Sequence, residues 1–226
     1  MINRIRTLSN WLIFRIGNKL LKENTKYLTG TLVDLGCGEK PNEAFLLKHV
    51  DKYIGVDWSN SLHNIKADVI SDLNKKIDID DQYADSVMSF SVMEHLCEPQ
   101  QFLNETFRIL KPDGYFVLQV PFQWWIHEGP YDYFRYTPYG LQYMLEKAGF
   151  EIIKISPTGG FFTTLVTKIN YFTIRMFKLP KFLWFIWLLF LVPFWTIGQL
   201  FAPLLDKLFD KDFNLETSGF WVVAKK

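Results

Sequence analysis

The stretch that decides the fold is VDLGCGEKP, residues 33–41. It begins as a short apolar run typical of a buried strand and leads directly into Gly36 and Gly38. Glycines at the carboxyl end of a strand let the backbone take unusual angles and let a ligand approach closely. A dinucleotide fingerprint needs a third glycine where Pro41 stands, which disfavours a nicotinamide-dependent dehydrogenase. Asp34, just before the glycines, suits a cationic ligand instead.

Outward from this turn, apolar runs typical of strands alternate with helical patterns. We expect strands at residues 31–35, 53–57, 67–70, 86–91, 115–120, 150–155 and 219–224, and helices at 43–48, 100–110 and 137–147. The turn at 111–114 is expected to stop the second of these helices, and Thr137 with Pro138 to start the third. The alternation predicts an α/β fold with a mostly parallel sheet covered by helices on both faces.

Acidic side chains follow the next two expected strands. Asp57 ends the second strand, where a carboxylate can accept hydrogen bonds from both hydroxyls of a ribose. Asp72 and Leu73 follow the third strand, where a carboxylate and an adjacent backbone N–H could hold an adenine ring. Asp68 competes with Asp72 for this role. The pattern indicates a nucleoside ligand.

Together with SVMEHL at residues 91–96 and LKPDGY at 110–115, these features resemble the class I S-adenosylmethionine-dependent methyltransferases. The resemblance is to the large group of small methyltransferases found in bacterial biosynthesis. It covers about residues 31–154 and resumes at the last strand. It implies a Rossmann-like sheet of seven strands, with the last strand antiparallel and inserted between the fifth and the sixth. It also implies S-adenosylmethionine as the cofactor.

The resemblance assigns residues to each part of the cofactor. It assigns Gly36 and Gly38 to the amino-acid end of the cofactor, Asp57 to the ribose and Asp72 to the adenine, and it places Ser91 and Val92 along the edge of the cofactor. Asp34 and Leu73, expected from the residues themselves, complete the set of cofactor residues. One departure concerns the loop after the adenine contact. Residues 74–77 read NKKI, where the family usually has Leu-Pro-Phe, so the shape of this loop is not expected to follow the family.

The acceptor side is expected in residues 123–139, QWWIHEGPYDYFRYTPY. Similar H-x-x-P-x-D-Y-x-R-x-T stretches occur in methyltransferases of polysaccharide and lipid-linked glycan pathways. We expect His127 and Arg135 to act in catalysis, because imidazole is a suitable general base and guanidinium can clamp a phosphate or carboxylate. Alternatively, Asp132 and Arg135 form an ion pair that braces the loop. His95 is expected to make structural hydrogen bonds, and no metal is expected.

Residues 182–205 carry no charged side chain and are long enough to cross a bilayer, which needs about 20 residues. They precede the last strand, however, and a single crossing would leave that strand on the wrong side of the membrane. Pro193 also interrupts the run. We therefore expect a re-entrant hairpin or an interfacial helix pair, with Trp184, Trp187 and Trp195 among the lipid head groups. A homodimer interface or a helical cover is the alternative.

The N-terminal residues 1–26 have helical spacing and mostly basic polar positions, which suits anionic lipid. Basic residues interrupt the apolar run, so no signal peptide is expected. The net charge of +1 argues against a nucleic-acid partner. The two cysteines, Cys37 and Cys97, lie in segments expected to be buried, which fits a reducing cytoplasm.

We therefore divide the chain into a basic N-terminal helix (1–30), a methyltransferase core (31–156), an apolar helical insertion (157–217) and the returning last strand (218–226). The predicted function is methyl transfer from S-adenosylmethionine at the cytoplasmic face of the cell membrane, with O-methylation of a sugar or lipid-linked intermediate as the leading reaction. The rival is a catalytically inactive methyltransferase-like protein that serves as a membrane-docked assembly partner. The intact glycine turn and acidic residues disfavour that rival.

Overall fold

The computed structural model describes residues 2–59, 64–176, 181–209 and 216–226. The chain divides into two compact units, and each is described by itself. Unit 1 comprises Met1–Leu20 and Pro157–Gly219, whereas unit 2 comprises Leu21–Ser156 and Phe220–Lys226. The apolar helices therefore belong to one unit and the sheet to the other.

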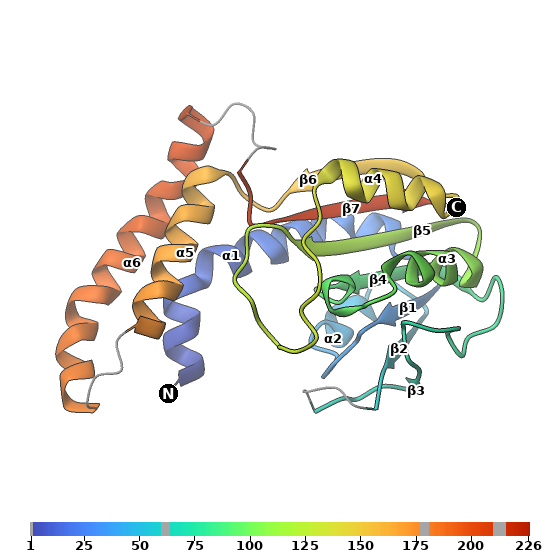
Figure 1. The fold of residues 1–226 in the computed structure, drawn as a ribbon, viewed down its shortest axis with the longest axis horizontal. Coiled ribbons are helices and arrows are strands. Elements are labelled where there is room, and N and C mark those ends of the chain that lie inside the picture. The colour runs from blue at the N-terminus through green and yellow to red at the C-terminus, as the bar shows by residue number, and fades with distance from the viewer. Residues whose placement is uncertain (1, 60–63, 177–180, 210–215) are drawn as a thin grey trace. The chain divides into compact units, whose positions relative to one another are not determined.

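Unit 2 is built on a seven-stranded sheet with the order β3-β2-β1-β4-β5-β7-β6 (Figure 1). Its strands are β1 Thr31–Leu35, β2 Lys52–Asp57, β3 Val69–Ile70, β4 Ala84–Phe90, β5 Leu110–Pro121, β6 Glu151–Pro157 and β7 Gly219–Lys225. The order places β7 between β5 and β6, as the resemblance implies. The predicted α/β class with a Rossmann-like sheet is confirmed.

The first five strands run parallel, and β7 runs against its neighbours. Parallel register pairs β1 with both β2 and β4, β2 with β3, and β4 with β5. The N–H of Asp113 near the start of β5 donates to the carbonyl of Lys226 just beyond the end of β7 at 3.1 Å. At the other end, the N–H of Thr158 donates to the carbonyl of Gly219 at 2.8 Å. Each bond joins the start of one strand to the end of its neighbour, so β7 is antiparallel to both β5 and β6.

The helices of the chain are α1 Ile2–Asn24, α2 Glu43–Leu46, α3 Pro99–Ile109, α4 Pro138–Lys147, α5 Phe161–Met176 and α6 Lys181–Phe209, with single 3₁₀ turns η1 at Thr25–Tyr27 and η2 at Met93–His95. Helix α4 begins as predicted, because the Thr137 hydroxyl oxygen accepts from the N–H of Gly140 at 3.1 Å. Helix α3 ends at Ile109, just before residues 111–114, as predicted, although the structure counts these residues within β5. They bulge from the ladder, because Ala84 pairs with Leu110 and Ser86 pairs with Tyr115. This start of the strand is irregular, and its register against β4 shifts between Ala84 and Ser86.

The core of unit 2 lies between the sheet and the helices around it. Apolar strand residues such as Val33, Val87 and Val222 are fully buried, and aromatic rings of α3 and β5 fill the space between these two elements. The rings of Phe102 on α3 and Phe116 on β5 lie 6.3 Å apart in an edge-to-face arrangement. This packing fixes the carboxyl ends of the central strands, where the site is built.

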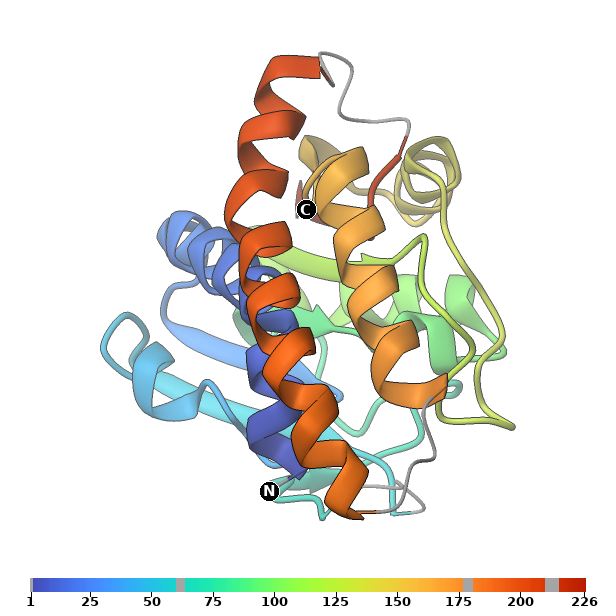
Figure 2. The same cartoon turned by 90° about the vertical axis from the view of Figure 1, so that its left-hand side faces the viewer.

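Unit 1 is a helical unit in which α5 and α6 lie side by side, as both views show (Figures 1 and 2). Asp206 of α6 accepts hydrogen bonds from the backbone N–H groups of Gly160, Phe162 and Thr163 at the start of α5. The first half of α1 joins them, because the Asn170 amide donates to the carbonyl of Ser9 at 2.6 Å. Long-range polar contacts therefore hold an otherwise apolar unit together.

Helix α6 continues through Pro193 and Pro203, so the predicted hairpin within residues 182–205 is wrong. The helical partner of α6 is α5, which contains Lys168 and Arg175. The expectation that Trp195 lies among head groups is also wrong. Its side chain is fully buried, and its indole N–H donates to the Thr173 hydroxyl at 2.9 Å. The side chain of Trp184 lies outside the described part of the structure.

Candidate active site

The glycine turn after β1 is bound to the end of β2. The N–H groups of Gly36 and Cys37 both donate to the carbonyl of Val56, at 2.8 and 3.1 Å. Gly36 has a φ of +84°, and a Cβ atom there would lie 2.1 Å from a methyl group of Val92. Gly38 has a φ of +51°, and a Cβ atom there would meet nothing within 4 Å. The turn therefore needs glycine at Gly36 for space and leaves an open surface at Gly38.

A cavity of about 720 Å³ opens in front of this turn. It lies at the carboxyl ends of β1, β2 and β4, where open α/β sheets bind ligands. Seven of the eight predicted cofactor residues line it, namely Gly36, Gly38, Asp57, Asp72, Leu73, Ser91 and Val92. Their contacts with a cofactor stay a prediction, but the fold does bring these residues from four separate segments to one cavity.

The two lining carboxylates of Asp57 and Asp72 are held in place by backbone N–H groups. Asp57 accepts from the N–H of Gly38 and from that of Trp58, each at 2.8 Å and each on a different oxygen. Because a carboxylate oxygen has two lone pairs, both oxygens can accept a further bond from a ribose hydroxyl. Asp72 accepts a hydrogen bond from the N–H of Asn74 at 3.0 Å. Burial raises the pKa of Asp72, but hydrogen bonds from Asn74 and Lys75 outweigh burial and hold this pKa below its ordinary value.

Asp34 and Asp68 lie outside the lining. The Asp34 carboxylate is buried and accepts a hydrogen bond from the Tyr53 hydroxyl. Burial raises the pKa of Asp34 to about 7. Asp68 accepts from the N–H of Gly55 at 2.7 Å and from the Lys40 ammonium at 2.6 Å, so it braces the turn from behind. A cofactor role for Asp34 stays a prediction, and Asp72 is better placed than Asp68 for the adenine.

Aromatic residues line the cavity both within the expected acceptor stretch 123–139 and outside it, where the sequence did not single out Trp58. Trp58, Tyr131 and Tyr133 line the cavity, and the Trp58 ring lies edge-on to the Tyr131 ring at 5.4 Å. The position of Trp58 directly after Asp57 was the available signal. Cys97, expected to be buried, is exposed and also lines the cavity. Both cysteines are free thiols.

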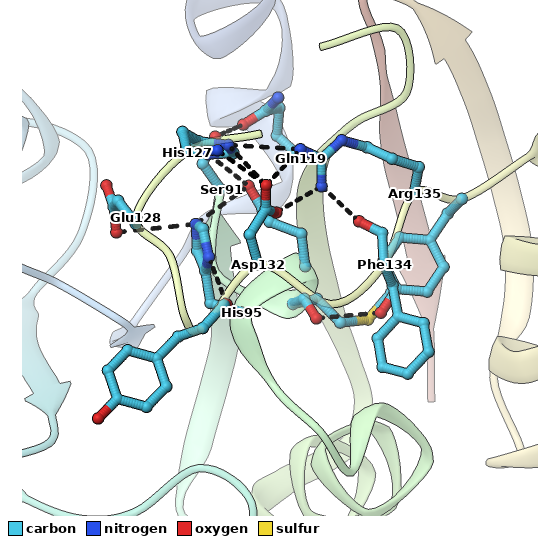
Figure 3. A network of polar contacts seen from close by, with 12 residues as sticks. Ser91, His95, Gln119, His127, Glu128, Asp132, Phe134 and Arg135 are labelled. Atoms are coloured by element: carbon cyan, nitrogen blue, oxygen red, sulfur yellow. Dashed lines mark hydrogen bonds and ion pairs between the residues drawn. The ribbon is translucent and has the colours of Figure 1, made fainter. Parts of the chain in front are cut away.

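The loop between β5 and α4 is braced by Asp132 and Arg135. The two Nη atoms of Arg135 donate to the two oxygens of Asp132 at 2.6 and 2.8 Å (Figure 3). The hydrogen bond from Arg135 holds the pKa of Asp132 down at about 2. Arg135 also donates to the carbonyl of Trp125 at 2.9 Å. The structure therefore contains the bracing ion pair, and neither His127 nor Arg135 lines the cavity.

The same loop is bound to η2 at the end of β4. The N–H groups of Tyr133 and Phe134 donate to the carbonyl of Glu94 at 2.9 and 3.2 Å. The Glu94 side chain is fully buried, and burial raises its pKa to about 8. His95 follows it and lines the cavity, with its Nδ1 2.9 Å from the carbonyl oxygen of Tyr131. The predicted structural hydrogen bond of His95 is therefore present.

Sequence comparison places the chain among methyltransferase domains. A family model described as a methyltransferase domain matches residues 11–155, which is more than half of the chain. A protein of Mycolicibacterium smegmatis, named a probable S-adenosylmethionine-dependent methyltransferase, is 27% identical over 133 residues. That match covers 54% of this chain and 52% of the relative, so the chain spans about half the length of this curated relative.

Solved structures show the same fold. An S-adenosylmethionine-dependent methyltransferase of Archaeoglobus fulgidus is similar with a TM-score of 0.58 and 18% identity, covering 94% of each chain. The phosphoethanolamine N-methyltransferase 2 of Haemonchus contortus, solved with S-adenosylmethionine, has a TM-score of 0.58 and 15% identity, and the match covers 92% of this chain and 52% of that one. With the glycine turn, the strand order and the family match in agreement, the chain belongs to the methyltransferase-domain family.

Proposed function

We propose that the chain binds S-adenosylmethionine in the cavity and transfers its methyl group to a hydroxyl-bearing acceptor. This proposal rests mainly on the observation that Gly36, Gly38, Asp57 and Asp72 line one cavity. The open surface at Gly38 can receive the amino-acid end of the cofactor, and the lone pairs left on Asp57 match two ribose hydroxyls. The matching family and the names of the relatives support the same ligand.

The cofactor supplies a sulfonium-bound methyl group, which is itself electrophilic. The acceptor oxygen forms its bond to the methyl carbon as the carbon–sulfur bond breaks, the electron pair of that bond stays on sulfur, and the hydroxyl proton leaves to water. The side chains of this protein contribute mainly by orienting the two reactants. His95 of η2 and Tyr131 and Tyr133 of the loop after β5 form the wall available to the acceptor.

The acceptor class that we propose is a sugar or lipid-linked intermediate. The wall has the aromatic rings that sugars and lipid chains pack against, and the loop has the H-x-x-P-x-D-Y-x-R-x-T pattern. His127 and Arg135 serve this side of the site. Arg135 acts as a positioning residue, because its guanidinium holds Asp132 and the Trp125 carbonyl. Arg135→Lys should not restore turnover lost in Arg135→Ala, because an ammonium cannot hold both oxygens of Asp132 in a fork.

Calorimetry with S-adenosylhomocysteine, S-adenosylmethionine and NAD tests the cofactor. The intact chain should bind both sulfur ligands and not NAD. Asp57→Asn should weaken S-adenosylhomocysteine binding by roughly 10-fold or more, since a hydrogen bond to a charged group contributes about 1.5–3 kcal/mol. Asp80→Asn, an exposed carboxylate outside the lining, is the matched control and should bind as the unaltered chain does. Binding of neither sulfur ligand would favour the inactive assembly partner.

We further propose that unit 1 docks on the cytoplasmic face of the cell membrane as a peripheral protein. In the part of the chain that the structure describes, one helical segment, Ile186–Phe209, is long and apolar enough to cross a membrane, and only 22% of its apolar window is buried. Its exposed large side chains recur at helical spacing along the whole segment, namely Ile186, Leu189, Phe190, Phe194, Ile197, Leu200, Phe201, Leu204, Leu208 and Phe209. The opposite side buries Trp195, Gln199 and Asp206. An apolar face along the whole length of a helix suits one lying in the plane of the interface.

Charge and redox state support the cytoplasmic side. Arg15, Lys19, Lys168 and Arg175 are exposed in unit 1, and each basic residue near anionic lipid contributes about 1 kcal/mol to binding. The two free thiols fit a reducing compartment.

Flotation with vesicles tests the docking. The intact chain should bind vesicles that contain anionic phospholipid, whereas a variant with 182–205 replaced by a short polar linker should stay in solution and still bind S-adenosylhomocysteine. The alternative is that the apolar face is a homodimer interface. In that case the chain is soluble without detergent, does not bind vesicles, and forms a dimer that the same deletion dissociates.

A further inference from the structure

Three metal-ligand side chains meet where η2 contacts the loop after β5. They are Glu94 and His95 of η2 and His127 of the loop, and one ligand atom from each lies within 4.8 Å of the others. Oε1 of Glu94 is 3.7 Å from Nε2 of His95 and 3.9 Å from Nε2 of His127. Figure 3 shows the two imidazole rings next to each other, between Glu128 and Asp132.

Both imidazoles turn the same nitrogen toward Glu94. Nδ1 of His95 lies 2.9 Å from the carbonyl oxygen of Tyr131, and Nδ1 of His127 lies 3.2 Å from that of Trp125 and 3.4 Å from Oδ2 of Asp132. The carbonyl oxygen of Tyr131 only accepts hydrogen bonds, so Nδ1 of His95 carries the ring hydrogen and its Nε2 keeps its lone pair. Nδ1 of His127 faces the oxygens of Trp125 and Asp132, and Nη2 of Arg135, which only donates, lies 3.4 Å from the same nitrogen. Histidines that bind metals are oriented by oxygen acceptors in this same way.

Glu94 supplies an independent observation. Its side chain is fully buried, and neither carboxylate oxygen has a hydrogen-bond partner among the residues that the structure describes. The neighbouring Arg135 gives its Nη groups to Asp132 and to the carbonyls of Trp125 and Phe134. Three lone-pair donors therefore face one another around a buried, unpaired carboxylate. The cost of this arrangement is relieved either by a proton on Glu94 that faces an imidazole nitrogen or by a cation held by all three groups.

We propose that Glu94, His95 and His127 bind a divalent transition-metal ion of the zinc type. Two imidazole nitrogens and one carboxylate oxygen suit zinc or iron, whereas magnesium and calcium prefer oxygen ligands alone. In a tetrahedral zinc site neighbouring ligand atoms are roughly 3.3 Å apart, whereas the three ligand atoms here lie within 4.8 Å of one another, so zinc binding requires the side chains to draw together by up to about 1.5 Å. A metal site is not expected from the sequence, because His127 lies far along the chain from the other two ligands.

The cluster adjoins the cavity through His95. His95 and Glu128 both line the cavity, and Oε2 of Glu128 lies 3.8 Å from Nε2 of His95. A metal ion with three protein ligands keeps a fourth position for water or substrate. This role rests on the proposed function: the ion binds the acceptor oxygen, lowers the pKa of its hydroxyl and so eases departure of the proton to water. The inference narrows the acceptor to an oxygen nucleophile that can reach the ion.

Metal binding can be measured without any acceptor. Tag-free protein is stripped with a chelator, dialysed and titrated with ZnCl₂ by calorimetry, with Co²⁺ absorption as a second readout of the ligand set and MgCl₂ as the comparison. We expect one zinc ion per chain and far weaker magnesium binding. Asp132→Asn, which alters the acceptor behind His127, should lower zinc affinity roughly 10- to 100-fold, and Glu94→Gln or His127→Ala should lower it further. His49→Ala removes an exposed histidine outside the cluster and should change nothing.

S-adenosylhomocysteine binding is measured on the same samples. It reports whether each variant is folded and tests the cofactor site separately. The metal site is overturned if the chain binds S-adenosylhomocysteine but no zinc. It is also overturned if His49→Ala reduces zinc binding as much as His127→Ala does. Zinc binding that depends on Glu94 and His127 in a chain that binds no sulfur ligand supports the site but overturns its role in methyl transfer.

Discussion

Replacing Asp34 with asparagine should remove a pH dependence of stability that the fold creates. Asp34 is buried beside the glycine turn, and burial raises its pKa from 3.8 to about 7. The hydrogen bond from Tyr53 and the charge of Lys40 lower the pKa of Asp34, but they do not cancel the effect of burial. The charge of Asp57 raises this pKa further. The substituted asparagine keeps the size of the side chain but carries no titrating proton.

The sign follows from proton binding. Between about pH 4 and pH 7 the folded chain keeps a proton on Asp34 that the unfolded chain has released, so the free energy of unfolding falls as pH rises through this window. Above about pH 7 both states are ionised and the contribution stays constant. A shift of about three pKa units corresponds to roughly 4 kcal/mol in total, and to roughly 3 kcal/mol between pH 5 and pH 7.

Urea unfolding of the two proteins from pH 5 to pH 8 measures this difference. Asp34→Asn should be more stable than the unaltered chain by a few kcal/mol at pH 8, and the two should converge toward pH 5. Tyr53→Phe removes a hydrogen bond that lowers the pKa, so its stability should level off at a higher pH than in the unaltered chain. Parallel stability curves for the unaltered chain and Asp34→Asn would refute the reasoning.

Three further substitutions test packing and capping. Gly36→Ala places a Cβ atom 2.1 Å from Val92 at a backbone φ of +84°. The affinity for S-adenosylhomocysteine should therefore fall, and the free energy of unfolding should drop by about 1–3 kcal/mol. Unchanged calorimetry and unchanged urea unfolding curves would contradict this. Asp206→Ala removes the acceptor at the start of α5, at a cost of roughly 2–3 kcal/mol, and hydrogen exchange at the Thr163 amide should speed up selectively. Thr137→Ala should cost about 1 kcal/mol in urea unfolding, and Thr137→Ser should restore most of it.

Much of the fold could be predicted because its signals are local. The run from Thr31 to Leu35 is apolar and ends at a glycine, and the structure places β1 within these bounds. The carboxyl ends of parallel strands meet at one edge of a sheet, so residues after β1, β2 and β4 had to lie near one another. Gly38, Asp57 and Ser91 accordingly line the same cavity.

The sequence could not show which polar groups find partners within the protein. Asp34 and Asp57 both stand at strand ends, yet the first is buried against Tyr53 and the second lines the cavity. Trp195 lies in an uncharged run that suggested exposure to lipid, but its indole donates to Thr173 on the neighbouring helix. Side-chain orientation of this kind depends on partners far along the chain, which hydrophobic spacing does not report.

The sequence alone determined the α/β class, the glycine turn and the family resemblance, because periodicity and strand-end residues are properties of short segments. The approach of Glu94 and His95 on η2 to His127 in the loop after β5 is visible only in the folded chain. The loop is held against η2 by the hydrogen bonds from the backbone N–H groups of Tyr133 and Phe134 to the carbonyl of Glu94. The bidentate ion pair between Arg135 and Asp132 fixes the shape of the loop. Contacts across such a separation depend on how the strands pack, so the composition of either segment could not predict them.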